Sequence, residues 1–354
     1  MNASDKNKFR RELSLEEIEE DINRNARSGL SRRDFIRNVS TGAVGAGLAV
    51  AGAGSAVHAA EKSRIILARD AKVMSVANTP DAKAVEAMFT ESMKRLTGQD
   101  SLGKAMGGIF KKDDVVGLKV NCLGKGTCST RPELVSAITK GLQEAGVLPQ
   151  NIIIWERKTK ELTKAGFVEA RDGGRVQVYG TDGDFDDKTV DKSGLGLKFS
   201  KILTTKITAL INVPMLKTHP LTGVTVSLKN HLGSIDNPNK FHQAGTFTEI
   251  AGLNASPVIK GKTRLIVCDA LRPLYNAGPG DSPAFRWNYG GLIVSRDPVA
   301  VDAFGKTILV AKRKEAKGEE WPITASGVSH IADSAKMGLG VDSLDKMDVI
   351  RIEA

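Results

Sequence analysis

Cysteine and aromatic residues are scarce in this chain of 354 residues. It has three cysteines and no Cys-x-x-Cys spacing, which makes a four-cysteine iron–sulfur cluster an unlikely cofactor. Aromatic side chains account for 5% of the residues, and no basic segment is interleaved with them. This composition argues against nucleic acid as a partner. Cys122 and Cys128 are close enough in sequence to bridge in an oxidising compartment, although two inert thiols are the simpler interpretation.

A long, strongly apolar run is also lacking. The stretch from Asn38 to Ala60 carries no Asp, Glu, Lys or Arg, but its apolar core, Val39–Val57, contains five glycines together with Ser and Thr. This core is too weakly hydrophobic to be a good membrane anchor.

The same stretch follows a twin-arginine motif, Ser31-Arg-Arg-Asp-Phe-Ile-Arg37, and ends at small residues, Val57 and Ala59. A charged segment, an apolar segment and a small-residue exit, in this order, are typical of a removable targeting peptide. We therefore expect residues 1–59 to be a twin-arginine signal peptide, and the twin-arginine export machinery to be a partner. The expected location is the periplasm. A disordered basic tail is the alternative, and the sequence leaves open whether the leader is cleaved.

Residues 60–354 are expected to form a single α/β domain. Short β-branched runs alternate with segments of helical periodicity, which favours a mainly parallel, doubly wound sheet with helices on both faces. The expected strands are Arg64–Ala68, Val115–Val120, Asn151–Trp155, Arg175–Tyr179, Ile207–Val213, Arg264–Cys268, Leu292–Ser295 and Val349–Ile352.

The net charge of +10 suits an anionic ligand, although a solvated basic surface is the simpler explanation of the charge alone. In open α/β sheets, ligands bind beyond the carboxyl ends of the strands. Polar groups just after the expected strands are therefore the best site candidates.

The first candidate segment contains Lys119 and Asn121 and continues through a glycine-rich loop to Thr130. Backbone N–H groups and lysines between a strand and a helix start suit a phosphate or carboxylate. The loop has neither the Walker A nor the GxGxxG spacing. A flexible turn with N-capping hydroxyls is the alternative.

The second and third segments carry lysine and histidine close together. Lys217 and His219 share a face in extended chain, at the end of an expected strand. Lys229 and Asn230 follow, and His231 and His242 lie within the same part of the sequence. Lysine beside imidazole can bind an anion or transfer a proton. Clustered imidazoles also make a metal a candidate cofactor, although the spacing matches no known metal motif.

Three aspartates follow hydrophobic runs. Asp269 directly follows the expected strand Arg264–Cys268 and is a candidate site carboxylate, with N-capping or turn formation as the alternative. Asp297 before Pro298 is typical of a helix N-cap followed by a first-turn proline. Asp302 then falls in the first turns of that helix.

The segments Asn212-Val-Pro-Met-Leu-Lys-Thr-His219 and Val224-Thr-Val-Ser-Leu-Lys-Asn-His-Leu-Gly233 closely resemble the central signature of the DUF362 family. Phe241-His242, the segment from Asp269 to Pro279 and Ser295–Asp302 share the resemblance, which runs from about Lys119 to Gly340. Members of this family are often associated with iron–sulfur or redox proteins, and some carry an appended ferredoxin-like domain. This chain lacks the cysteines of that domain, so a cluster-based redox role is not implied.

The resemblance implies candidate site positions and not a reaction. They are Lys119, Asn121, Lys217, His219, Lys229, Asn230, His242 and Asp269. We expect an enzyme that holds an anionic small molecule with Lys119, Asn121, Lys217, Lys229 and Asn230, and that uses His219, His242 and Asp269 in catalysis. A metal or redox cofactor and a redox partner protein fit the same pattern. The alternatives are a non-catalytic protein that binds an anion, metal or cofactor, and a scaffolding subunit of an exported redox complex.

Overall fold

The computed structural model describes residues 62–124, 126, 128–171, 173–189, 196–242, 249–323 and 329–353. The leader expected at residues 1–59 lies outside them. From Lys62 onward the chain forms one compact unit. No helix among the described residues has both the length and the apolarity needed to cross a bilayer.

A mainly parallel sheet runs through this unit, as the alternating pattern predicts. Of the eight strands in its main path, only β11 runs against the others, and it lies between β1 and β10. The main path, in spatial order, consists of β12 (Met347–Glu353), β1 (Ser63–Arg69), β11 (Gly291–Ser295), β10 (Thr263–Leu274), β7 (Ala209–Val213), β2 (Val116–Val120), β3 (Ile152–Glu156) and β4 (Gln177–Gly180). Two short strands, β5 (Phe185–Thr189) and β6 (Lys198–Ser200), pair separately.

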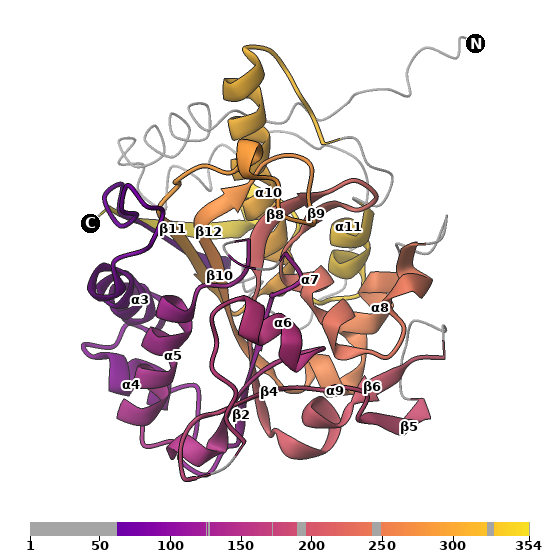
Figure 1. Ribbon diagram of the computed structural model, residues 1–354. Helices are drawn as coiled ribbons and strands as arrows, with labels where there is room; N and C mark the ends of the chain where they lie inside the picture. Colours follow the sequence, from indigo (N-terminus) through magenta and orange to yellow (C-terminus); the bar gives the residue numbers. More distant parts are fainter. Residues whose placement is uncertain are drawn as a thin grey trace, which may run out of the picture. The chain divides into compact units, whose positions relative to one another are not determined.

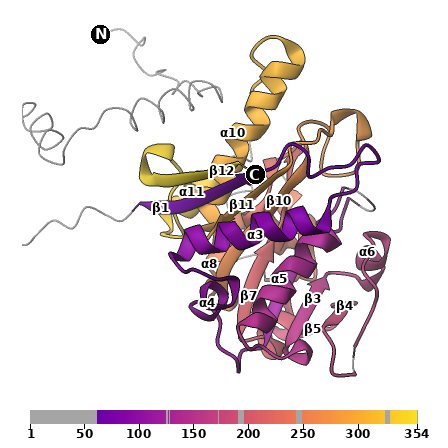
Figure 2. The same ribbon diagram turned by 90° about the vertical axis from the view of Figure 1, so that its left-hand side faces the viewer.

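Helices cover both faces of the sheet, which explains why its strands are nearly continuous apolar runs. In β3, Ile152 and Ile154 join the core on one side, while Ile153 and Trp155 join the core on the other. Figure 1 shows one group of helices on the left of the sheet and a second group on the right, and Figure 2 shows the first group from its own side. The first group contains α3 (Ala82–Thr97), α4 (Leu102–Gly107) and α5 (Pro132–Glu144). The second contains α7 (Ser227–Asn230), α8 (Glu249–Ala255), α9 (Pro257–Lys260) and α11 (Ser329–Lys336). α10 (Pro298–Lys317), at the top of Figure 1, packs on the same core through its first half.

Beyond the main path, the sheet carries a hairpin that the sequence patterns did not predict. After Pro214 the chain continues as β8 (Met215–His219), which pairs antiparallel with β9 (Gly223–Thr225). The outer half of β10 runs beside β8, with Leu274 opposite Lys217. The strand expected to end at Cys268 therefore continues for six more residues to Leu274, and Asp269 lies inside it.

The starts of α10 and α5 differ in whether a side chain caps them. Asp297 caps α10 as predicted, accepting hydrogen bonds from the backbone N–H groups of Val299 (2.9 Å) and Ala300 (2.8 Å). The hydroxyl of Thr130 does not cap α5. It accepts from the N–H of Asn121 (2.9 Å) and donates to the carbonyl of Val213 (2.8 Å), which ties the loop after β2 to the end of β7.

Candidate functional site

Most of the predicted site residues meet where β2, β3 and β7 end. This is the edge at which parallel sheets bind their ligands. Three segments surround it: the loop after β2, the β8–β9 hairpin with α7, and the turn after β10. The predicted residues brought together here, all buried, are Lys119, Asn121, Lys217, His219, Lys229, Asn230 and Asp269. The side chain of His242 lies outside the described residues.

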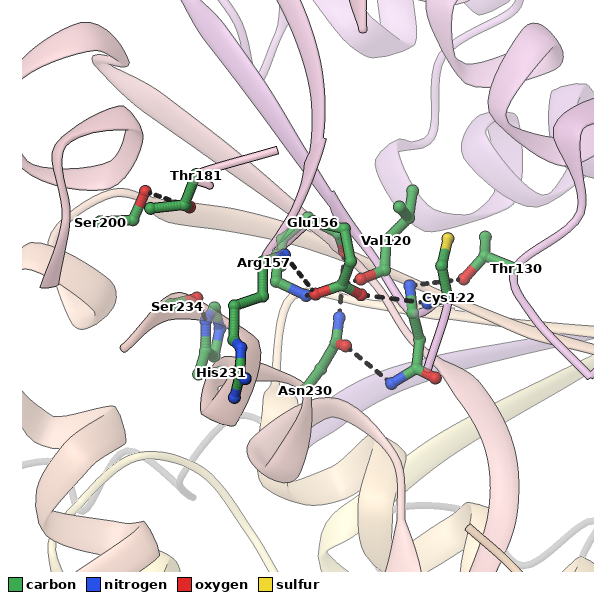
Figure 3. Close-up of polar contacts among 12 residues, drawn as sticks. Val120, Cys122, Thr130, Glu156, Arg157, Thr181, Ser200, Asn230, His231 and Ser234 are labelled. Atoms are coloured by element: carbon green, nitrogen blue, oxygen red, sulfur yellow. Dashed lines mark hydrogen bonds and ion pairs between the residues drawn. The ribbon is translucent and has the colours of Figure 1, made fainter. Parts of the chain in front are cut away.

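Lys119 is held in a buried ion pair with Glu156, the last residue of β3. Its Nζ lies 2.7 Å from Glu156 Oε1 and donates a hydrogen bond to the carbonyl of Val120, also at 2.7 Å. Glu156 Oε2 accepts from the N–H of Cys122 (3.0 Å), and Oε1 accepts from the N–H of Arg157 (2.8 Å), as Figure 3 shows. The charge of Lys119 is therefore compensated within the protein.

Glu156 was not among the predicted site residues. The signal that selected the others would have found it, because Glu156 is the first charged residue after the apolar run of β3. The partner of Lys119 is set by the pairing of β2 with β3, which places Lys119 opposite Trp155.

Three asparagines connect α7 to the sheet through hydrogen bonds. Asn230 Nδ2 donates to the carbonyl of Lys119 (3.0 Å) and to Asn212 Oδ1 (2.8 Å). Asn121 Nδ2 donates to Asn230 Oδ1 (3.0 Å). Asn212 Nδ2 donates in turn to the carbonyl of Ser227 (2.9 Å). Asn230 thus uses both ends of its amide within the protein.

Asp302 of α10 completes the anchoring of α7. Its Oδ1 accepts from the N–H of Ser227 (2.7 Å), and Oδ2 accepts from the N–H of Leu228 (3.3 Å). Burial, more than any other cause, raises the pKa of the Asp302 carboxyl well above its usual range. The helical pattern of the sequence places Asp302 in α10 but gives no sign of this contact with α7.

The histidines do not form a metal cluster among the described residues. No group of three or more His, Cys, Asp or Glu side chains there could hold a metal ion. His231 lies within hydrogen-bonding distance of Asn212 (3.2 Å) and Ser234 (3.3 Å), and burial lowers its pKa to about 3. His219 Nδ1 accepts from the N–H groups of Leu221 (3.2 Å) and Thr222 (3.3 Å), so a neutral His219 ring carries its proton on Nε2.

Lys217 occupies the centre of the site. Its side chain is fully buried, and its Nζ has no hydrogen-bond partner in the described part of the chain. Burial is the largest effect on the pKa of Lys217, and it lowers this pKa. Cys128 and Glu156 act in the opposite direction. Burial, and then the charge of Lys217, lowers the pKa of Lys229 to about 7. The two ammonium groups are thus close enough to repel each other.

Asp269 joins three elements through backbone groups. Its carboxylate accepts from the N–H of Arg131 at the start of α5 (2.8 Å) and from the N–H of Leu271 (3.0 Å). Its own N–H donates to the carbonyl of Pro214 (2.8 Å). Burial is the largest cause of a raised pKa for this carboxyl. Both oxygens are engaged by backbone, so this geometry positions β8 and α5 around the site.

All three cysteines are free thiols and buried. Burial raises the pKa of Cys122 well above its usual value, and it also raises the pKa of Cys128. Cys128 Sγ lies 3.8 Å from the carbonyl oxygen of Gly280, which brings the loop after β2 against the turn after β10.

A pocket of about 470 Å³ opens between these two segments. Leu123, Gly124 and Gly126 line it on one side, and Gly280 and Asp281 on the other. The turn packs directly on β8, because a Cβ atom added at Gly278 would lie 2.0 Å from the carbonyl oxygen of Thr218, the neighbour of Lys217. The pocket therefore lies beside the strand that carries Lys217 and His219.

The fold and the site define an α/β protein with buried lysines at the carboxyl ends of its strands. The family described as "Domain of unknown function (DUF362)" matches residues 116–307, more than half of the chain. The chain therefore belongs to the DUF362 family, as its lysine motifs predict.

Two solved structures are similar in part. A protein from Thermotoga maritima is 14% identical with a TM-score of 0.34, and the match covers 64% of this chain and 59% of that one. The lactate racemase apoprotein from Thermoanaerobacterium thermosaccharolyticum is 15% identical with a TM-score of 0.37, and the match covers 66% of this chain and 54% of that one. The chain thus spans between half and three-fifths of the length of each. No curated protein matches the sequence.

Proposed function

We propose that this DUF362 protein binds an anionic small molecule beside Lys217 and acts on it as an enzyme. The observation that carries the proposal is the Lys217 ammonium, which is fully buried without a hydrogen-bond partner in the described part of the chain. A buried charge of this kind is costly unless an opposite charge accompanies it. A carboxylate or phosphate of a ligand would supply that charge.

The polar groups around Lys217 support a ligand that also donates a hydrogen bond. Asn121 Oδ1 is buried and has no partner among the described residues, although Nδ2 of the same amide is engaged. Lys119, by contrast, is neutralised by Glu156. Among the predicted ligand-binding residues, we therefore assign ligand contact to Lys217 and Lys229, and the positioning of α7 to Lys119 and Asn230.

Proton transfer is the chemistry that this site supports best. The pKa of Lys229 is lowered to about 7, so its amine can gain or lose a proton near neutral pH. His219 lies two residues from Lys217 on β8 and is held by two backbone N–H groups. We assign proton transfer to Lys229 and His219, at a position next to the ligand's anionic group.

Inorganic phosphate is a suitable first probe of the binding step. We expect phosphate to raise the Tm of the full chain above its value in chloride of equal ionic strength, because a ligand that binds the folded state stabilises it. This increase should disappear in Lys217→Met and persist in Lys111→Met, which removes an exposed lysine before β2, at the opposite end of that strand. An increase of equal size in all three proteins would show that phosphate acts elsewhere and would overturn the proposal.

The catalytic step needs a separate measurement. Native mass spectrometry of the full chain should detect an anion that co-purifies with wild type and is lost in Lys217→Met. Incubation of that anion with the protein in D₂O should then introduce deuterium, or form product, at a rate that depends on Lys229. Retention of the anion without either change would favour the alternative, a non-catalytic binding protein.

Export by the twin-arginine route is also part of the proposal. It is supported by the motif Ser31–Arg37 and by the small residues at Val57 and Ala59. A redox partner protein stays a prediction from the family resemblance.

A further inference from the structure

Four cationic side chains share one neighbour at the mouth of the site. The thiol of Cys128 lies within electrostatic range of Lys217, Arg131 and Arg286, and Arg272 lies within range of Cys128. Cys128 also packs with Met215 of β8 and Leu274 of β10 in a small apolar cluster. The four cations are thus close enough to influence one thiol, although they come from four separate segments.

Arg272, whose side chain is half-buried, differs from Arg131 and Arg286 because its guanidinium has no partner among the described residues. Its Nε is buried without a partner, and no hydrogen bond or ion pair to its guanidinium occurs within the described residues. The register between β10 and β8 shifts between Asp269 and Leu274, and an irregularity of this kind redirects side chains out of the regular alternation. Arg272 lies in this irregular part of β10.

The neighbouring charges make the uncompensated charge of Arg272 more costly. Burial, and then Arg286 and Arg131, lower its pKa, while Asp281 acts in the opposite direction. Asp281 already pairs with Arg286, whose Nε lies 3.1 Å from Asp281 Oδ1. Arg131 donates from Nη2 to the carbonyl of Asn78 (3.3 Å), which carries no net charge. Positive charge thus exceeds negative charge around Arg272, as it does around Lys217.

We infer that the ligand carries two anionic groups, one compensated by Lys217 with Lys229 and the other by Arg272. This inference rests on the proposed function and names its substrate class. A guanidinium binds a carboxylate or a phosphate through two parallel hydrogen bonds. The shared chemistry is therefore that of a dicarboxylate or a phosphorylated carboxylic acid. The space beside Cys128 and the adjoining pocket at Gly280 and Asp281 would hold the part of the molecule between the two groups.

Calorimetric titration of the full chain with matched ligand pairs tests this inference. The pairs are propionate with malonate, butyrate with succinate, valerate with glutarate, and glycerate with 3-phosphoglycerate. In at least one pair, we expect the doubly charged member to bind wild type about tenfold or more tightly than the singly charged member, the equivalent of about 1.4 kcal/mol. Arg272→Gln should remove this difference and leave the affinity for the singly charged member unchanged.

Two further variants separate this inference from the proposed function. Lys217→Met should weaken both members of a pair, whereas Lys111→Met should weaken neither. Equal affinities within every pair, or a difference that survives Arg272→Gln, would overturn the second anionic group while leaving the proposed function intact. If no probe binds wild type, or if Lys217→Met binds as wild type does, the proposed function fails as well. Thermal unfolding of each variant verifies that it is folded.

Discussion

At the scale of single residues, the two fully buried lysines of the site lie in opposite environments. Lys119 has Glu156 and a carbonyl as partners, whereas Lys217 has no hydrogen-bond partner among the described residues. We expect Lys119→Met to lower the free energy of unfolding by about 3 to 5 kcal/mol, because it leaves the Glu156 carboxylate buried and unpaired. Lys217→Met should raise it by about 1 to 3 kcal/mol, because it removes an unsatisfied buried polar group.

Urea unfolding of both variants in ligand-free buffer measures this contrast. Exposed Lys111→Met is the control and should change the free energy of unfolding by less than about 0.5 kcal/mol. A destabilised Lys217→Met would mean that the ammonium is satisfied in the folded protein, and the argument for an anionic ligand would lose its basis.

The lowered pKa of Lys229 also predicts how stability depends on pH. Its ordinary pKa of 10.5 falls to about 7 in the folded protein, chiefly through burial. Between these values the unfolded chain binds more protons than the folded chain, so stability should increase with rising pH in this window. Below about pH 7 both states are protonated, and the contribution of Lys229 should be constant.

The comparison of wild type with Lys229→Met isolates this contribution. The difference between their free energies of unfolding should rise above about pH 7 in favour of wild type, with a limiting slope of about 1.4 kcal/mol per pH unit. Lys217 is present in both proteins, so its own titration largely cancels. Parallel stability curves would contradict a lowered pKa for Lys229.

At the scale of elements, the segment after α7 packs directly on the buried ion pair. A Cβ atom at Gly233 would lie 2.5 Å from Glu156 Oε1 and 2.6 Å from Lys119 Nζ. We expect Gly233→Ala to displace the pair and to lower the free energy of unfolding by about 1 to 3 kcal/mol, as overpacking of cores does. Anion binding should weaken as well, because α7 carries Lys229.

A glycine with free space provides the control for this substitution. Gly107 lies in α4, and a Cβ atom there would have its nearest neighbour at 3.9 Å. Gly107→Ala should be neutral or stabilising by up to about 1 kcal/mol, because alanine is the better helix former. Chemical denaturation of the two variants should therefore give shifts that differ in size or sign. Equal shifts would show that Gly233 is not in tight contact with the pair.

Most strands of the main sheet could be predicted from the sequence, whereas the β8–β9 hairpin could not. Most of these strands are apolar runs, and several are buried along their whole length, such as Val116–Val120 and Gly291–Ser295, so the alternation of such runs with helical patterns located them. The edge strand Met347–Glu353 is only partly buried, and its mainly apolar segment Val349–Ile352 was enough to predict it. The β8–β9 hairpin was not predicted, because its strands mix polar and apolar residues. Only the pairing of β8 with β10 makes this hairpin part of the sheet.

The sequence predicted residues that the structure brings close together, but it did not predict their different environments. Position at or just after the end of a strand identified Lys119, Lys217 and Asp269 equally well. Their different environments depend on contacts far apart in sequence, such as that between Lys119 and Glu156, 37 residues apart. Residue type and spacing contain no information about which of two buried lysines has a carboxylate beside it.

At the scale of the whole molecule, the site exists only in the completed fold. Its side chains come from segments between Lys119 and Arg286, and they meet only when β2, β7, β8 and β10 are assembled in one sheet. An anionic ligand would therefore bind after folding and stabilise the product. This requirement agrees with the expected export route, which transports folded proteins and would allow a ligand to be bound before export.

Export itself provides the last prediction. Arg32→Lys combined with Arg33→Lys preserves the charge of the leader but removes the twin arginine that the motif requires. We expect the double variant to remain in the cytoplasmic fraction, whereas Arg37→Lys, a substitution of equal chemistry outside the pair, should be exported. Cell fractionation followed by immunoblotting measures both. A double variant found in the periplasm at the wild-type level would show that residues 1–59 do not use this route, and it would leave the site around Lys217 to be judged by its own experiments.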